Sequence, residues 1–189
     1  MNFKMPLLLC FSLILVSELL LAAPVVDQAG QWSESVGGLQ ARLIISQKPM
    51  VNGTSIVSVH LEIRNVSDIG NPMEVPVHPE KIKFTLLDSA DKPVSESFLP
   101  RSGIGVQWGD LILPFDSSMR LGLTCYNVAI PKDERALIPL PSQDWVIKKG
   151  DKTTYCLKAT ISSEGENKSS KHIWLGLITT PTVVIKLRD

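Results

Sequence analysis

The sequence predicts an all-β fold, an antiparallel β-sandwich that follows an N-terminal signal peptide. Apolar and polar residues alternate with a period of two over several segments, which is typical of strands with one buried face. Turn-forming residues separate these segments, and the chain contains 12 glycines and 13 prolines. No window of ten or more residues carries the apolar stripe of an amphipathic helix. Short alternating strands between turns favour a sandwich.

The first 23 residues have the layout of a secretory signal peptide. Lys4 precedes an apolar run, and the segment ends with the small residues Ala22 and Ala23, where signal peptidase cuts. We expect cleavage after Ala23 and a secreted or periplasmic product. The alternative is an uncleaved anchor, because residues 6–23 approach the roughly 18 apolar residues of a membrane span. Glu18 inside the run favours cleavage.

The mature chain is predicted to be one neutral domain. Removing residues 1–23 deletes one basic and one acidic residue from the 19 of each, so 18 of each remain. We interpret residues 24–38 as an N-terminal extension and residues 39–189 as a single β-sandwich domain. This charge balance disfavours a basic nucleic-acid binder, and no later segment reaches membrane-spanning length.

Alternation places the strands in order along the domain. In the first strand, Ala41, Leu43 and Ile45 alternate with Gln40, Arg42 and Ile44. The predicted strands cover residues 39–45, 57–63, 82–86, 119–125, 153–161, 173–178 and 182–187. The turns between them fall at residues 52–53, 69–72, 89–93, 103–105 and 149–151.

Two stretches rich in proline or glycine, residues 98–118 and 127–145, are predicted to be long connections. Long ordered loops on a rigid sandwich often carry binding residues, although these two could also only cap the open ends of the sheets. We take the 98–118 stretch, with Arg101 and Trp108, as the first candidate binding surface.

The four tryptophans divide into two groups. Trp174 lies among apolar neighbours and is expected in the core, and Trp145 is expected to start a strand. Trp32 and Trp108 have polar or glycine-rich neighbours and are expected to be exposed. Exposed tryptophans can form a carbohydrate platform or a protein hot spot, so Trp32 joins the candidate binding residues.

Two cysteines, Cys125 and Cys156, remain after signal removal. An even number in an oxidising compartment favours a disulfide. The alternation opposes it, because it places Cys125 on the core face of its strand and Cys156 on the face opposite Tyr155 and Leu157. Two thiols in different layers do not meet without a bulge or a shift in register. Both alternatives stay open.

Residues for catalysis and for cofactors are sparse, and we predict no catalytic residue, no cofactor and no enzyme. The chain lacks a nucleophile elbow and the local motif of a cysteine protease. His60 and Glu62 share one strand face about 7 Å apart, so they could share a metal ion if His78 or His172 supplied a third ligand. A solvated strand face explains the pair equally, and we predict no metal site.

Three Asn-x-Ser/Thr sequons begin at Asn52, Asn65 and Asn167, all at predicted turns. In a eukaryotic secreted protein they would be glycan acceptors, whereas in a bacterium they would be turn residues only.

Three segments carry a resemblance to a known group of domains: residues 59–67, residues 84–88, and residues 147–151 leading into Tyr155. Together they resemble immunoglobulin-like domains of secreted bacterial proteins, and they are similar in outline to the bacterial intracellular proteinase-inhibitor domain. The resemblance implies an immunoglobulin-like sandwich and favours the bacterial reading of the sequons. It carries no functional residue over to this chain.

These observations predict an exported, non-catalytic protein that acts by binding or by structural support. The expected partner is a protein or a cell surface, not a nucleic acid. One alternative is a peptidase inhibitor that inserts an exposed loop into a protease. Another is a metal-assisted hydrolase built on His60 and Glu62.

Overall fold

The computed structural model describes residues 26–49, 55–68, 70–96, 109–123, 135–140, 143–148, 154–163 and 173–186. These residues form twelve strands and one 3-10 turn, Pro79–Lys81, with no α-helix among them. Within the same ranges, the chain has no helix of the length and hydrophobicity that a membrane crossing requires.

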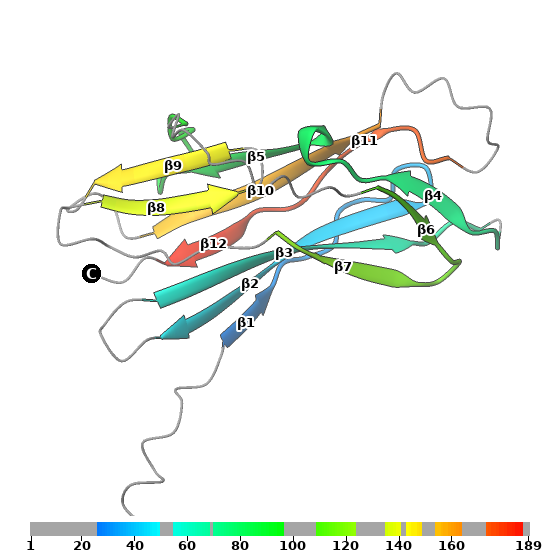
Figure 1. Cartoon of the computed structure of the whole chain (residues 1–189), viewed down its shortest axis with the longest axis horizontal. Coiled ribbons are helices and arrows are strands. Elements are labelled where there is room, and N and C mark those ends of the chain that lie inside the picture. Colours follow the sequence, from blue (N-terminus) through cyan, green and yellow to red (C-terminus); the bar gives the residue numbers. More distant parts are fainter. Residues whose placement is uncertain are drawn as a thin grey trace, which may run out of the picture.

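One sheet contains four antiparallel strands in the order β1-β2-β3-β7 (Figure 1). Its centre is the pair β2 (Leu39–Pro49) and β3 (Ser55–Asn65), in register from Leu39 opposite Asn65 to Pro49 opposite Ser55. The edge strands are β1 (Val26–Ala29) and β7 (Ser118–Gly122).

The second sheet is built around β10 (Thr154–Ser162). β5 (Ile82–Leu87) pairs with one edge of β10, and β12 (Val183–Lys186) and β11 (Leu177–Thr179) share the other edge. All of these pairs are antiparallel. Figure 1 shows this sheet stacked over the first, so the described chain has a sandwich-like, two-layer architecture.

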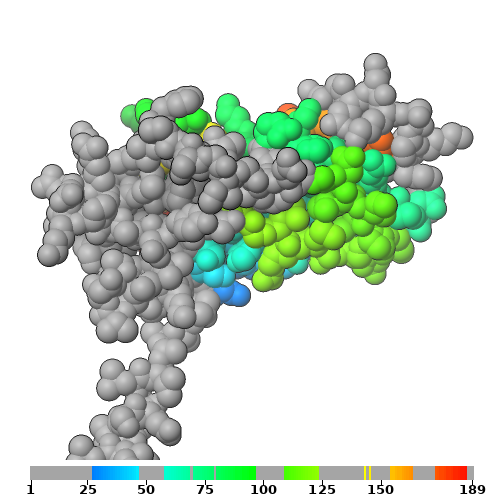
Figure 2. All heavy atoms as spheres, in the orientation of Figure 1, coloured from blue at the N-terminus to red at the C-terminus, as the bar shows by residue number. Residues whose placement is uncertain are grey.

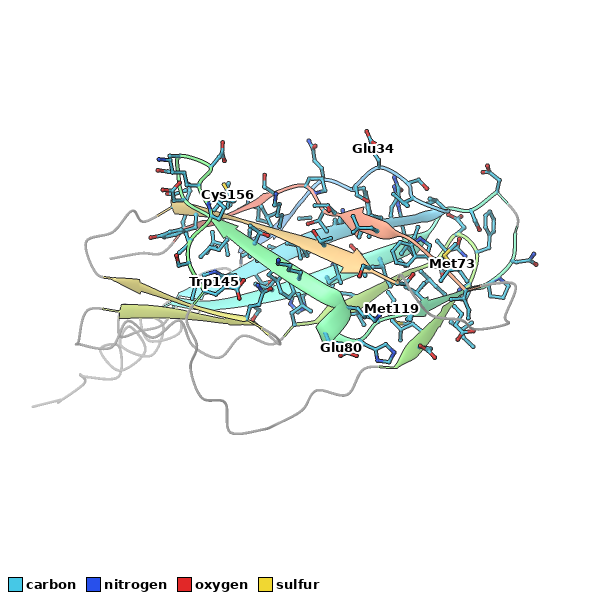
Figure 3. All side chains as sticks on the ribbon, turned by 90° about the horizontal axis from the view of Figure 1, so that it is seen from above. Glu34, Met73, Glu80, Met119, Trp145 and Cys156 are labelled. Atoms are coloured by element: carbon cyan, nitrogen blue, oxygen red, sulfur yellow. The ribbon has the colours of Figure 1, made fainter. Side chains whose placement is uncertain are left out.

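The core lies between the two sheets and confirms the predicted alternation. In β10, buried and partly exposed residues alternate along the whole strand. The buried side chains that fill the space between the layers include Leu39, Ala41, Leu43, Ile45, Val59, Leu61, Ile63, Ile82, Phe84, Leu86, Tyr155, Leu157, Ala159, Ile161, Ile178, Val183 and Ile185. In Figure 3, Trp145 lies toward one end of the molecule, and Met73 and Met119 lie toward the other.

Two further antiparallel strand pairs extend the layers and correct the prediction of two long loops. β4 (Met73–Pro76) pairs with β6 (Asp110–Leu113), and β8 (Arg135–Leu140) pairs with β9 (Gln143–Lys148). β6 and the first residue of β7 therefore fall within residues 98–118, and β8 and part of β9 fall within residues 127–145. Among the described residues β8 pairs with β9 alone, so Pro139, which has no N–H to donate, is tolerated on its other edge.

The β8–β9 hairpin is joined to the second sheet by two side chains of β9. The backbone N–H of Phe84 donates to Gln143 Oε1, and Gln143 Nε2 donates to Glu96 Oε1 at 2.5 Å. Trp145 Nε1 donates to the carbonyl of Val94 at 3.2 Å. Trp145 lies in a strand, as predicted, but the strand starts at Gln143, and the indole is buried.

Trp174 is in the core, as predicted, and it connects three segments. Its backbone N–H donates to Glu74 O at 2.8 Å, and its indole Nε1 donates to Val36 O at 2.7 Å. The predicted strand over residues 173–178 is divided, because Ile173 forms an isolated parallel bridge with Glu74 and β11 starts only at Leu177.

Candidate functional site

Trp32 is positioned by an irregular segment, residues 30–36, that continues β1 along the edge of β2. Gly30 N donates to Leu43 O at 2.8 Å, and Ser33 N donates to Ala41 O at 2.9 Å. Residues 30 to 33 of this segment therefore span the same length of sheet as residues 43 to 41 of β2. The extra residue makes the segment a β-bulge. The bulge leaves Gln31 and Trp32 opposite the single residue Arg42, and it directs the indole over the outer face of the sheet.

The indole of Trp32 is in contact with two arginines. The guanidinium carbon of Arg42 lies 4.3 Å from the centre of the ring, and that of Arg64 lies 4.2 Å from it. Both distances fit cation–π contacts, which contribute about 0.5–1 kcal/mol each at exposed sites and more when desolvated. Arg42 comes from β2 and Arg64 from β3, so the ring joins residues 30–36 to both central strands.

Each arginine is also held by a second group. Arg42 Nε donates to Glu62 Oε2 at 2.6 Å, with the two side chains only 25% and 12% exposed. Arg64 Nε donates to Gln40 Oε1 at 2.8 Å, and Gln40 Nε2 donates to Ser33 O at 2.8 Å. We call Trp32, Gln40, Arg42, Glu62 and Arg64 the Trp32 cluster. These side chains hold one another in position, so the cluster fastens residues 30–36 to β2 and β3 on the outer face of the sheet.

The Trp32 cluster brings together two residues that the sequence suggested for different roles, Trp32 for binding and Glu62 for metal. Trp32 is partly exposed, and two cations of the same chain already contact its ring. The carboxylate of Glu62 accepts from Arg42 and, at 3.4 Å, from Ser118 Oγ. His60 shares the outer face with Glu62, but the described residues contain no group of three His, Cys, Asp or Glu side chains placed to hold a metal.

Several other predicted site residues lie outside the described ranges. These are Arg101, Trp108, Cys125 and His172. Cys156 is partly exposed and forms no disulfide with a described residue, and Cys125 lies outside the described ranges, so the predicted Cys125–Cys156 disulfide is not shown. His78 Nε2 lies 3.4 Å from Asp110 Oδ1.

A second surface is formed by exposed apolar side chains. Among the described residues, every exposed large hydrophobic side chain comes from residues 112–115 or 175–177. The exposed fractions are 69% for Ile112, 49% for Phe115, 58% for Leu175 and 51% for Leu177. Single exposed apolar residues are ordinary, but a group on neighbouring segments is a feature of contact surfaces.

Strand register places these two segments side by side. Ile112 lies opposite Glu74 in the β4–β6 pair, and Glu74 forms the parallel bridge with Ile173. Residues in register across a sheet point to the same face, so Ile112 and Ile173 flank Glu74. Leu175 and Leu177 follow at a period of two, while Trp174 and Ile178 point inward and are buried. We call Ile112, Phe115, Ile173, Leu175 and Leu177 the apolar strip.

The apolar strip lies toward one end of the sandwich, where β4, β6 and the segment that leads into β11 meet (Figure 1). In Figure 2, residues from 110 to 123 cover much of the near face at this end, next to residues from the region of β4. Ile112 and Phe115 belong to residues 98–118, which the sequence predicts as a binding surface. Leu175 and Leu177 were not predicted to bind, although their alternation with the buried Trp174 was the available signal.

Comparison of the chain with protein-family models, with curated proteins and with solved structures finds no match. The antiparallel sheets are compatible with the β-sandwich that the sequence implied.

Proposed function

We propose that this chain is an exported, non-catalytic protein with an immunoglobulin-like sandwich, and that it binds a protein partner through the apolar strip. The observation that carries the proposal is the gathering of all exposed large hydrophobics of the described residues on two adjoining segments. The signal-peptide layout of residues 1–23 supports export, and the resemblance of residues 59–67 and 84–88 supports the sandwich.

Energetics favour contact at this surface. Fully burying a Leu, Ile or Phe side chain contributes about 1.5–3 kcal/mol, so burying the exposed half of one contributes roughly 1 kcal/mol. Four such side chains together offset part of the entropy cost of association. Glu74, between Ile112 and Ile173, adds a carboxylate within the strip that a donor on the partner can meet.

The test replaces apolar side chains of the strip by lysine in the full chain, exported with its own leader. The variant Ile112→Lys/Leu175→Lys removes contact area and adds two charges that are costly to bury. Proteins cross-linked to the wild type in the exported fraction are identified and purified, and their affinities are then measured by calorimetry. We expect at least a tenfold loss of affinity for the double variant, because two buried anchors contribute about 2 kcal/mol or more.

Gln28→Lys is the matched control, because Gln28 is an exposed strand residue of the other sheet. It should bind like the wild type, and all variants should keep the circular dichroism spectrum and melting temperature. Equal affinity of the double variant and the control would refute the assignment of the strip. A wild-type chain that self-associates through the strip, as judged by sedimentation, would contradict the hetero-partner.

A further inference from the structure

Asn65, the acceptor residue of one sequon, is fully buried. It is the last residue of β3 and its exposed fraction is 0%. Glycan acceptors need an accessible side chain in the folded protein, because the attached sugar is bulky and hydrophilic. The burial of Asn65 therefore conflicts with its place in an Asn-Val-Ser sequon.

The side-chain amide of Asn65 is fully used within the chain. Its Oδ1 accepts from Ser67 N at 3.0 Å and from Ser67 Oγ at 2.7 Å. Its Nδ2 donates to Asn71 O and to Leu113 O, each at 3.1 Å. Two donors face one end of the amide and two carbonyls face the other, so the network fixes its orientation.

The backbone of Asn65 adds further bonds at the same place. Asn65 N donates to Ser117 O at 3.0 Å, and Asp116 N donates to Asn65 O at 3.1 Å. The residue therefore joins the end of β3 to the segment before β4, to the end of β6 and to the turn before β7. We call this set of bonds the Asn65 clamp.

Glycan transfer would attach the sugar to Asn65 Nδ2, an atom that already takes part in this clamp. In N-glycosylation, the amide nitrogen forms a bond to the first carbon of the sugar, a lipid pyrophosphate leaves, and one amide hydrogen is lost as a proton. The nitrogen then has one hydrogen for two carbonyls, so Asn71 O or Leu113 O loses its donor. The sugar would also have to occupy a position where the structure has no exposed surface.

We propose that the Asn65-Val66-Ser67 sequon is an internal structural clamp, and that a glycan transferred to Asn65 prevents the chain from reaching this fold. Loss of a single buried hydrogen bond lowers the ratio of folded to unfolded protein by a factor of about 5 to 30. The excluded volume of the sugar lowers it further. The chain thus matures efficiently only where Asn65 escapes glycan transfer.

The experiment compares Ser67→Thr with Ser67→Ala. Both variants also carry Asn52→Gln and Asn167→Gln, which remove the other two sequons and leave Asn65 as the remaining acceptor position. Ser67→Thr keeps the sequon and a hydroxyl, whereas Ser67→Ala removes both and keeps the backbone bond from residue 67 to Asn65 Oδ1. Both full-length variants are expressed in a bacterial periplasm without N-glycosylation and in a eukaryotic secretory cell. Secreted yield, melting temperature and glycan occupancy by mass spectrometry are measured.

We expect the order of the two variants to reverse between hosts. In the bacterium, Ser67→Thr should be at least as stable as Ser67→Ala, because it retains a hydroxyl for Asn65. In the eukaryotic cell, Ser67→Thr should be secreted at a severalfold lower yield, with the glycan confined to retained chains. Equal or higher secretion of Ser67→Thr there would overturn the proposal. So would a secreted, monomeric chain that carries a glycan on Asn65 and melts at the unglycosylated temperature.

Discussion

At the scale of single residues, the buried polar side chains of the described ranges form hydrogen bonds within the chain. Ser163 is buried, and its Oγ donates to Trp174 O at 2.6 Å and accepts from Gly176 N at 3.1 Å. Thr180 is buried, and its Oγ1 accepts from Ala159 N at 3.0 Å. Such groups stabilise only while both partners are present, because an unpaired buried donor or acceptor costs about 1–3 kcal/mol.

The Trp32 cluster yields a stability prediction. Trp32→Ala removes both cation–π contacts and the apolar cover of the two guanidinium groups. We expect it to lower the free energy of unfolding by about 2 kcal/mol, measured by urea denaturation. Trp32→Phe keeps a ring and should lose less than half as much. Equal losses for the two variants would show that the ring contacts do not stabilise the fold.

Residue-level prediction from the sequence was accurate for orientation but not for contacts. The alternation around Tyr155 placed it inside and Cys156 outside, as the structure shows. The stacking of Trp32 on Arg42 and Arg64 was not predictable, because a bulge shifts the alternation by one residue and no local pattern announces that shift.

At the scale of elements, glycine conformation sets the hairpin that leads into β2. Gly37 and Gly38 have φ values of 57° and 81°, and Val36 and Leu39 exchange backbone hydrogen bonds across them. Two consecutive positive φ values in a two-residue loop fit the type I′ turn that suits the twist of a hairpin. The turn thus directs residues 30–36 back along β2 and positions Trp32.

Gly38→Ala should strongly destabilise the protein. The added Cβ would lie 2.6 Å from Ser67 Cβ and 3.0 Å from Ser67 Cα, in a backbone conformation that alanine disfavours. We expect the free energy of unfolding to fall by about 2 kcal/mol or more, as measured by thermal and urea denaturation. Gly109→Ala is the control, because a Cβ there meets nothing within 4 Å and its φ is not positive. A loss for Gly38→Ala no larger than for Gly109→Ala would contradict this account.

Among the elements, the long alternating strands were predictable and the short ones were not. β2, β3, β5 and β10 bury one face against the core, so their hydrophobic period identifies them. β4 has only four residues and ends in Pro76, and β6 is an apolar run, Leu111-Ile112-Leu113, without alternation. Both depend on pairing with each other, which a local pattern does not encode.

At the scale of the whole molecule, the candidate contact surface depends on the tertiary fold. Glu74 and Ile173 are far apart in the sequence, yet their parallel bridge places the segment that leads into β11 beside β4, which pairs with β6. The sequence identified residues 98–118 as a surface of interest but not the second segment that completes it. Composition and periodicity therefore predicted the layers, while the register between distant strands determined the surface.

The proposed export yields a prediction about processing of the amino-terminal segment. The exported product should start at Pro24, as shown by its intact mass after fractionation of the expressing cells. Ala23→Tyr should block processing, because signal peptidase requires a small residue before the cut. Val25→Tyr, just after the site, should be processed normally. A cell-retained chain of full mass, or an Ala23→Tyr variant that is cut as before, would refute the assigned signal.

The order of strands along β10 also constrains the timing of assembly. β12 contributes Val183 and Ile185 to the interior and pairs with the first half of β10, and it follows the other strands of this sheet in the sequence. In an exported chain that crosses the membrane amino terminus first, as we propose, the second sheet would stay incomplete until residues 183–186 had crossed. A nascent chain stalled before Val183 should then remain accessible to chaperones and proteases.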